Sequence, residues 1–169
     1  LIIFDLNGVL LHREVKGRKK FNAEYSCFVA GRRTYIRPNA KNYIEKLIET
    51  NDVAVWSTAN YNNILLMLDA IGVDKSMLLF IWSNTECVPT GKVDEKNKPL
   101  LLKPLTLVWQ KYPKYNSSNT ILVDDSSLKT NVNPKQCVYV PKSFDNPDEK
   151  DESLYENGKI KLFLEQMCK

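Results

Sequence analysis

Three short apolar runs, each ended by a polar residue, constrain the fold of this 169-residue chain more than any other feature. The runs cover residues 1–4, 53–56 and 120–123. They end at Asp5, Ser57 and Asp124, and helical patterns lie between them. Apolar runs of this length indicate buried strands, and strands that alternate with helices predict an α/β fold with a mostly parallel sheet. Ligands of such sheets bind at the carboxyl ends of the strands, which is where these polar residues lie.

The spacing of apolar, glycine and proline residues predicts the other elements. We expect strands at 77–82 and 137–140, a hairpin at 25–36, and helices at about 38–51, 64–71, 104–112 and 157–169. A loop is expected at 12–25, and a loop or a short hairpin at 84–98. We expect residues 1–169 to form a single domain, since the length is ordinary for one domain and 43% of the residues are hydrophobic. Because Leu1 already belongs to a core strand, we also expect the natural protein to extend further upstream.

The residue types available restrict the chemistry. The single histidine, His12, argues against a histidine-based triad or a zinc site with several histidines. The four cysteines are far apart and lack CxxC spacing, so we expect reduced thiols in an intracellular protein, nuclear or cytoplasmic. No apolar run is long enough to span a membrane. The chemistry must therefore use carboxylates, hydroxyls and lysines.

The first strand ends in the motif Asp5-Leu-Asn7-Gly8. Side chains of a strand alternate between its faces, so Asp5 and Asn7 project to one side if the extended geometry continues. Gly8 permits a sharp turn and a close approach of the backbone to a ligand. A carboxylate beside backbone amides suits a nucleophile that holds a phosphoryl group next to a metal. An Asx turn that caps the strand is the simpler alternative.

Further polar residues follow later elements at Ser57, Lys103 and Asp124-Asp125. Taken singly, Ser57 could cap a helix, Lys103 could lie on the surface and the two aspartates could cap a turn. Adjacent buried carboxylates repel each other and lose hydration, and a Mg²⁺ ion would relieve both effects. As an ordered set, these positions together with Asp5 are hard to explain as caps.

The motifs resemble those of the haloacid-dehalogenase (HAD) superfamily, and within it the branch of RNA polymerase II C-terminal-domain phosphatases and NLI-interacting-factor-like proteins. The resemblance extends over nearly the whole chain. It rests on Ile3-Phe-Asp5-Leu-Asn7-Gly8-Val-Leu10, Tyr35-Ile-Arg37-Pro38, Val55-Trp56-Ser57-Thr58-Ala59, Lys103-Pro-Leu-Thr-Leu107 and Ile121-Leu-Val-Asp124-Asp125-Ser126. It implies an α/β, HAD-like (Rossmannoid) domain with a mostly parallel sheet flanked by helices, small hairpin insertions and no large cap.

The resemblance also implies the site. Asp5 would be the nucleophile that forms an aspartyl-phosphate, and Ser57 with Thr58 would bind the phosphoryl group. Lys103 would stabilise Asp5 and the transferred charge. The cofactor would be Mg²⁺, and its ligands would be Asp5, the backbone carbonyl of Asn7, Asp124 and Asp125.

Asn7 departs from the family, which usually has a second aspartate there as general acid and base. Asn can donate a hydrogen bond but cannot carry a proton, and general acid–base catalysis is typically worth about 10²–10⁴-fold. We therefore expect a slow Mg²⁺-dependent phosphoserine or phosphothreonine phosphatase, or an enzyme that needs a good leaving group. An introduced Asp→Asn change would have the same effect. The alternative is a catalytically weak, phospho-dependent binding or scaffold protein.

The net charge is +4, and basic residues gather in the first third of the chain. A site without a large cap suits a phosphorylated protein or peptide, and we expect Arg18, Lys19 and Lys20 to contact its acidic residues. The alternative is that this basic loop is plain surface. A nucleic-acid-binding module is a weaker interpretation, because the chain has no recognisable nucleic-acid motif. No membrane partner is expected, and the sequence indicates no particular oligomeric state.

Overall fold

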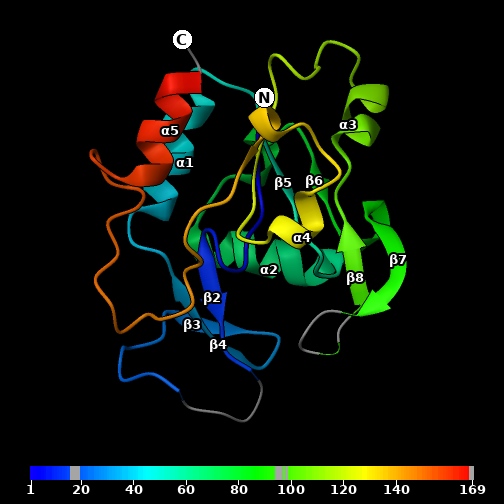
Figure 1. Ribbon diagram of the computed structural model, residues 1–169. Coiled ribbons are helices and arrows are strands. Elements are labelled where there is room, and N and C mark those ends of the chain that lie inside the picture. The colour runs from blue at the N-terminus through cyan, green and yellow to red at the C-terminus, as the bar shows by residue number, and fades with distance from the viewer. Residues whose placement is uncertain (16–19, 94–96, 98, 168–169) are drawn as a thin grey trace.

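A parallel sheet of five strands forms the centre of the structure, a computed structural model that describes residues 1–15, 20–93, 97 and 99–167 (Figure 1). Its strands are, in spatial order, β10 (Val138–Tyr139), β9 (Ile121–Val123), β1 (Ile2–Phe4), β5 (Val53–Trp56) and β6 (Ile81–Trp82). Every neighbouring pair is parallel. Because β1 is the central strand, Asp5 follows it in the middle of the carboxyl edge of the sheet.

Helices cover both faces of this sheet. The apolar side chains of β1 alternate between the two faces, so each face has apolar surface for a helix to pack against. Ile2 and Phe4 pack in a core cluster with residues of α1 (Ala40–Ile48), α2 (Tyr61–Ile71) and α5 (Lys159–Met167). Ile3 packs on the opposite face with residues of α3 (Leu105–Lys111). The predicted α/β fold, a mostly parallel sheet flanked by helices, is confirmed.

Two small antiparallel sheets accompany the central sheet (Figure 1). One has the order β2-β4-β3 and consists of β2 (Leu11–Arg13), β3 (Cys27–Val29) and β4 (Arg32–Ile36). The other pairs β7 (Val88–Val93) with β8 (Pro99–Leu102), and β8 leads directly into Lys103. The hairpin expected at 25–36 is formed by β3 and β4. A loop or a short hairpin was expected at 84–98, and the structure has a hairpin whose second strand, β8, lies beyond residue 98.

Short helical segments complete the described part of the chain. They are η1 (Lys75–Met77), η2 (Asn84–Glu86), α4 (Ser127–Thr130) and η3 (Lys135–Cys137). The cysteines that the structure describes, Cys27, Cys87 and Cys137, are free thiols. No helix of the described residues is long and apolar enough to cross a membrane.

Several predicted boundaries were wrong. The loop expected from residue 12 begins with strand residues, because Leu11–Arg13 pairs with β4. The strand expected at 77–82 is confined to Ile81–Trp82, since the Asp74 side chain accepts a hydrogen bond from the Ser76 amide (2.9 Å) and caps η1 instead. The last strand begins at Val138, one residue later than expected.

Helix boundaries differ in the same way. Pro104 was expected to be the first residue of a helix, but it precedes the helix, which begins at Leu105. α4 was not predicted, because a single helical turn carries no apolar periodicity. The C-terminal helix begins at Lys159 rather than at 157, and residues 168–169 lie outside the described residues.

A buried arginine, Arg37, links a loop near the N-terminus to a segment in the C-terminal part of the chain. Nε and Nη2 of Arg37 donate to the two carboxylate oxygens of Asp151, at 3.0 and 2.8 Å, and Nη1 donates to the carbonyl oxygen of Val9 (2.8 Å). Burial of an arginine requires such pairing, because an unpaired charge would cost several kcal/mol. Arg37 therefore fixes the segment around Asp151 against the loop that follows Asp5.

Candidate active site

Asp5 is buried at the end of β1 between two ammonium groups. Its Oδ1 lies 3.1 Å from Nζ of Lys103, and its Oδ2 lies 3.6 Å from Nζ of Lys129. Burial raises the pKa of Asp5, but the positive charges of Lys103 and Lys129 outweigh this effect and hold the pKa below its usual range. The carboxylate is therefore ionised at neutral pH, as a nucleophile must be.

Lys103 is a buried ion-pair partner and not a surface residue, which rules out the simpler alternative for this position. Its Nζ contacts both Asp5 and Asp124, the latter at 2.5 Å, and its side chain is 0% exposed. Its backbone carbonyl accepts a hydrogen bond from Asn133 Nδ2 (2.9 Å). The position directly after β8 thus carries the ammonium group into the carboxyl edge of the sheet.

Asp124 and Asp125 follow β9, the strand beside β1, and they lie in different surroundings. Oδ1 of Asp124 accepts a hydrogen bond from the Ser126 amide (2.8 Å), as the turn alternative expected, while its Oδ2 pairs with Lys103. Oδ2 of Asp125 accepts a hydrogen bond from Ser143 Oγ (2.7 Å). Asp125 therefore has no lysine at hydrogen-bonding distance within the described part of the chain, whereas Asp124 does.

The three carboxylates form a group that fits a divalent cation. One oxygen each from Asp5, Asp124 and Asp125 can be chosen so that all three lie within 4.8 Å of one another. Burial, and then the negative charge of Asp5, raise the pKa of the Asp125 carboxyl. A cation with hard oxygen preference, such as Mg²⁺, would offset this repulsion. The residues present therefore fit the metal that the motifs imply.

Gly8 allows Asp125 to occupy its place. The residue has φ +94, and a Cβ added there would overlap the carboxylate of Asp125 and come within 3.0 Å of Ser143 Oγ. Glycine is thus required both by the backbone conformation and by the close approach of the side chain. The sequence predicted a close approach at Gly8, and the structure shows that the approaching group is a carboxylate of the protein.

A Gly8→Ala variant is expected to lose Mg²⁺ binding at millimolar concentration, because the new methyl group displaces the Asp125 carboxylate. Isothermal titration calorimetry measures this directly. Gly31→Ala is the matched control: Gly31 also has a positive φ (+70), but a Cβ there meets no atom within 4 Å. If Gly8→Ala binds Mg²⁺ as tightly as Gly31→Ala, Asp125 is not a ligand.

Ser57 and Thr58 lie at the end of β5, directly beside β1. The register pairs Phe4 with Val55, so the residues after Val55 run alongside Asp5. Ser57 is buried, and its Oγ accepts a hydrogen bond from the Ala59 amide (3.3 Å). It does not cap the following helix, because that role belongs to Asn60, whose side chain accepts from the Asn63 amide. The strand order thus places Ser57 at the same carboxyl edge of the sheet as Asp5, on the neighbouring strand.

Asn7 is exposed, and its side chain has a defined partner. Its Oδ1 accepts a hydrogen bond from the Arg13 amide at the end of β2 (2.8 Å). β1 ends at Phe4, so the extended geometry does not continue through Asn7. An aspartate carboxylate could accept the same hydrogen bond, and the local structure would therefore tolerate either residue.

Lys129 was missed by the sequence analysis. It lies on α4, four residues after Asp125, and its Nζ is 3.6 Å from Asp5 and 3.9 Å from Oδ1 of Asp124. Burial lowers the pKa of Lys129, but the charges of Asp5 and Asp124 outweigh this effect and raise it. The sequence feature that could have identified it is a lysine four residues after a pair of aspartates at a strand end. This pattern is too common to predict a site residue by itself.

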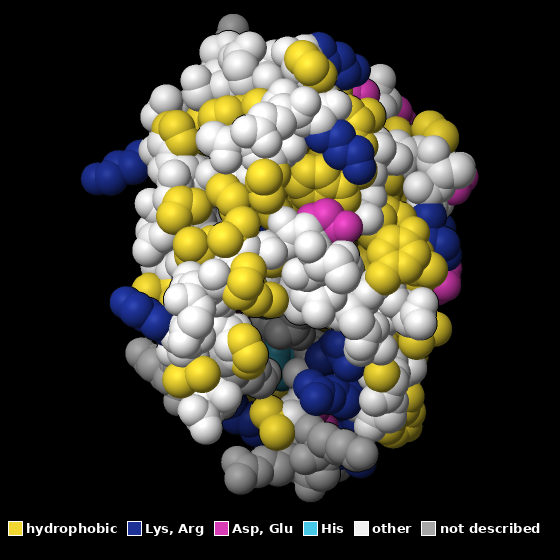
Figure 2. Space-filling view, turned by 90° about the vertical axis from the view of Figure 1, so that its right-hand side faces the viewer, with side chains coloured by type: hydrophobic (Ala, Val, Ile, Leu, Met, Phe, Trp, Pro, Cys, Tyr) yellow, Lys and Arg dark blue, Asp and Glu magenta, His cyan; other side chains and the backbone are white. Residues whose placement is uncertain are grey.

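The predicted substrate-binding residues are described only in part. Arg18 and Lys19 lie outside the described residues, and Lys20 is exposed with its Nζ 5.3 Å from the ring centroid of Phe21. Figure 2, which displays one face of the molecule, shows Lys and Arg side chains gathered at a hollow in its lower half. Arg13 on β2 and Arg32 on β4 belong to the same small sheet, and burial, followed by the charge of Arg32, lowers the pKa of Arg13.

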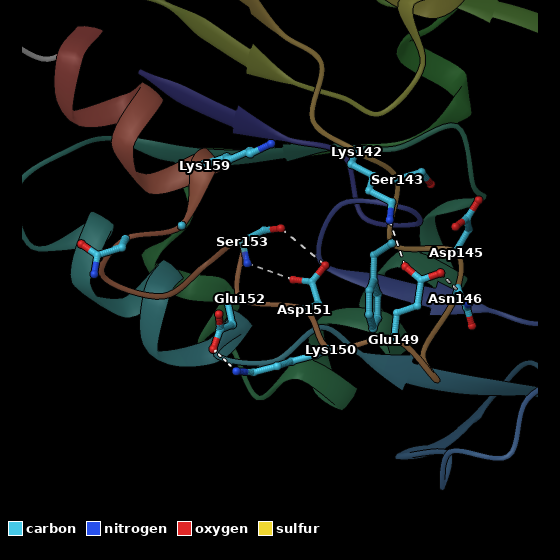
Figure 3. Close-up of a pocket in the computed structure, with 13 residues that line it drawn as sticks. Lys142, Ser143, Asp145, Asn146, Glu149, Lys150, Asp151, Glu152, Ser153 and Lys159 are labelled. Carbon is cyan, nitrogen blue, oxygen red and sulfur yellow. Dashed lines mark hydrogen bonds and ion pairs between the residues drawn. The ribbon is translucent and has the colours of Figure 1, made fainter.

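A cavity of about 270 Å³ is lined by residues between Lys142 and Lys159, and Ser143 is one of them. Four of its charged side chains are paired with one another: Figure 3 shows Lys142 turned toward Glu149, and Lys150 toward Glu152. The cavity therefore has the character of a packed polar surface, and we assign no chemistry to it.

Comparisons with known proteins extend over almost the entire chain. The sequence pattern of the NLI interacting factor-like phosphatases matches residues 1–168. An uncharacterized FCP1 homology domain-containing protein of Schizosaccharomyces pombe is 31% identical over 160 residues, which cover 86% of this chain and 64% of the relative. A ubiquitin-like domain-containing CTD phosphatase 1 of Drosophila melanogaster is 30% identical over 113 residues, covering 62% of this chain and 33% of the relative. The chain thus spans between a third and two thirds of these relatives.

Two solved structures share the fold. A variant of the fission yeast RNA polymerase II CTD phosphatase Fcp1 bound to beryllium fluoride aligns with a TM-score of 0.56 and 15% identity, covering 99% of this chain and 51% of that one. A structure of Fcp1, described as an essential RNA polymerase II CTD phosphatase, aligns with a TM-score of 0.57 and 14% identity, covering 98% and 48%. At this level of identity the likeness concerns the fold alone.

Proposed function

Since the chain belongs to the NLI interacting factor-like phosphatases, in the RNA polymerase II CTD phosphatase branch of the HAD superfamily, we propose that it is a phosphoprotein phosphatase that works through an aspartyl-phosphate. The observation that carries the proposal is the position of Asp5, which is buried at the centre of the sheet edge between two lysines and beside Asp125. A structural ion pair would not require a third carboxylate at the same point.

The reaction then has two steps. An oxygen of Asp5 attacks the phosphorus of a phosphoserine or phosphothreonine, and the bond from phosphorus to the serine or threonine oxygen breaks. The departing oxygen takes its proton from water, because the Asn7 amide has no proton to give at neutral pH. Water then attacks the phosphorus of the aspartyl-phosphate, which releases inorganic phosphate and restores the Asp5 carboxylate.

The surrounding residues stabilise the negative charge of the transferred group. Ser57 and the Thr58 amide would hold its oxygens, and Lys103 would keep Asp5 ionised and oriented. Mg²⁺, held by Asp5, Asp125 and the Asn7 carbonyl, would supply additional charge neutralisation. Asp124 was also predicted as a ligand, but its pairing with Lys103 favours a role in fixing that lysine.

The substrate class follows from the surface around the site. Small hairpins rather than a large cap accompany the sheet edge, which suits a phosphorylated residue on a protein or peptide. Arg13 on β2 and Arg32 on β4 belong to the same small sheet and support an acidic partner, to which Arg18, Lys19 and Lys20 would add positive charge. We also treat residues 1–169 as one domain and place the protein inside the cell, in the nucleus or cytoplasm.

Asn7 favours a second candidate, a phospho-dependent binding or scaffold protein with little turnover. The phosphoryl-binding groups do not depend on Asn7, so recognition of a phosphopeptide could persist without hydrolysis. The two candidates differ in whether phosphate is released and not in whether it is bound.

An assay with an aryl phosphate, in Mg²⁺ and in excess chelator, tests the proposal. We expect slow release of the aryl alcohol in Mg²⁺, and we expect this release to stop when the metal is removed. Without the metal, the negative charge of the three aspartates would repel the phosphate dianion of the substrate. Phosphopeptide binding without release in either condition would favour the scaffold candidate. Absence of both binding and release would contradict both candidates.

A further inference from the structure

Lys103 and Lys129 both face Asp5, but they differ in how fully they are engaged. Nζ of Lys103 lies at 3.1 Å from Asp5 and 2.5 Å from Asp124, and its side chain is 0% exposed. Nζ of Lys129 lies at 3.6 Å and 3.9 Å from the same two residues, and its side chain is 23% exposed. Lys103 is thus enclosed by its two carboxylates, whereas Lys129 reaches Asp5 from the accessible side.

The contacts of Lys129 leave donor capacity on its ammonium group. An ammonium group has three N–H donors, and hydrogen bonds from nitrogen to oxygen are about 2.7–3.2 Å long. The two carboxylate contacts of Lys129 within the described part of the chain are longer than that. A phosphoryl oxygen arriving at Asp5 could therefore be bound without breaking a hydrogen bond that holds the fold.

The backbone fixes Lys129 independently of its ion pairs. Its carbonyl oxygen accepts a hydrogen bond from the amide of Lys103 (2.9 Å). The next residue, Thr130, is buried and donates from Oγ1 to the Ser126 carbonyl (3.3 Å). The two lysines are therefore joined through the main chain, and the backbone position of Lys129 does not depend on Asp5.

Without a ligand, the charged groups around Asp5 carry a net negative charge. Three carboxylates, Asp5, Asp124 and Asp125, face two ammonium groups. A metal ion would make the group cationic, and a phosphoryl dianion would then be attracted to it. Removing Lys129 would take one positive charge from the side on which the phosphoryl group arrives.

We propose that Lys129 is a second phosphoryl-binding cation, which donates a hydrogen bond to a non-bridging oxygen while the phosphoryl group passes to Asp5 and while it remains there. The assignment rests on the proposed function of the site and adds a residue to it. Lys103 holds the nucleophile, and Lys129 binds the group that the nucleophile receives. Such preorganised donors act most strongly on charge that develops during the transfer.

Lys129→Met and Lys129→Arg, with Lys135→Met as control, test this role. Lys135 is exposed on η3, which leads into the amino end of β10, at the opposite edge of the sheet. The Lys129→Met variant should weaken binding of inorganic phosphate in Mg²⁺ by roughly tenfold or more, as expected for one lost charge-assisted hydrogen bond. It should also slow the single-turnover release of an aryl alcohol by roughly 10²-fold. Lys129→Arg should restore much of both, and Lys135→Met should change neither.

A purely structural role predicts a different result. Lys129→Met would then lower the thermal unfolding midpoint while leaving the phosphate dissociation constant of the folded protein unchanged, and the proposal would be wrong although the proposed function stands. If the unaltered protein binds no phosphate and releases no aryl alcohol, the proposed function fails, and the role of Lys129 fails with it.

Discussion

Replacing Asn7 by Asp is expected to raise steady-state turnover of a phosphoserine peptide by roughly 10²-fold or more. The new carboxyl group can protonate the departing serine oxygen and then take a proton from the attacking water. The local structure favours the change, because Oδ1 of Asn7 accepts a hydrogen bond from the Arg13 amide (2.8 Å) that a carboxylate also accepts. Steady-state phosphate release from the peptide measures the effect.

The gain should depend on the leaving group. Release of an aryl alcohol in a single turnover should rise less, because an aryl oxide departs without protonation. Asn157→Asp, at an exposed position, is the matched control and should change neither rate. If Asn7→Asp gains nothing while Mg²⁺ and phosphopeptide still bind, the scaffold candidate is favoured. If the unaltered protein already hydrolyses phosphoserine rapidly, another group supplies the proton.

Replacing Asp5 by Asn is expected to abolish phosphoryl transfer from both peptide and aryl phosphate. The amide has nearly the shape of the carboxylate but is not nucleophilic, so the loss reflects chemistry rather than packing. Phosphopeptide binding should persist, since Ser57, Lys103 and Lys129 remain. Calorimetry and single-turnover assays separate these two properties.

Asp69→Asn provides the control for this change. Asp69 is exposed on α2 and pairs with Lys75, so its amide variant should retain the transfer rate of the unaltered protein. Measurable turnover by Asp5→Asn would show that Asp5 is not the nucleophile. Loss of phosphopeptide binding together with transfer would show that Asp5 is needed to assemble the site.

The parallel sheet could be predicted because each core strand is a short apolar run that is followed directly by a polar residue. β1, β5 and β9 are fully buried apolar runs, and the polar residues after them must lie at one edge. This argument brings together Asp5, Ser57 and Asp124 with no knowledge of side-chain positions. Lys103 could be predicted as a site residue only together with these positions, because nothing in the sequence around a single lysine after a short strand indicates that it is buried.

Other features depend on contacts that a linear pattern does not carry. α4 is a single turn without apolar periodicity, and the backbone position of Lys129 is fixed by its hydrogen bond with the amide of Lys103. β2 exists because Leu11 and its neighbours pair with β4, more than twenty residues away. The side chain of Asn7 is set by the amide at the end of that strand. In each case tertiary pairing decides the local conformation.

Direct detection of the aspartyl-phosphate tests the central claim. The protein is incubated with an aryl phosphate and Mg²⁺, quenched in acid, digested and analysed by mass spectrometry. We predict a hydroxylamine-sensitive phosphoryl group on Asp5, at higher occupancy than in Asn7→Asp, because Asn7 cannot activate water for its hydrolysis. A phosphoryl group on another residue such as Ser57, or aryl alcohol release with no phosphorylated protein at any time, would contradict the account.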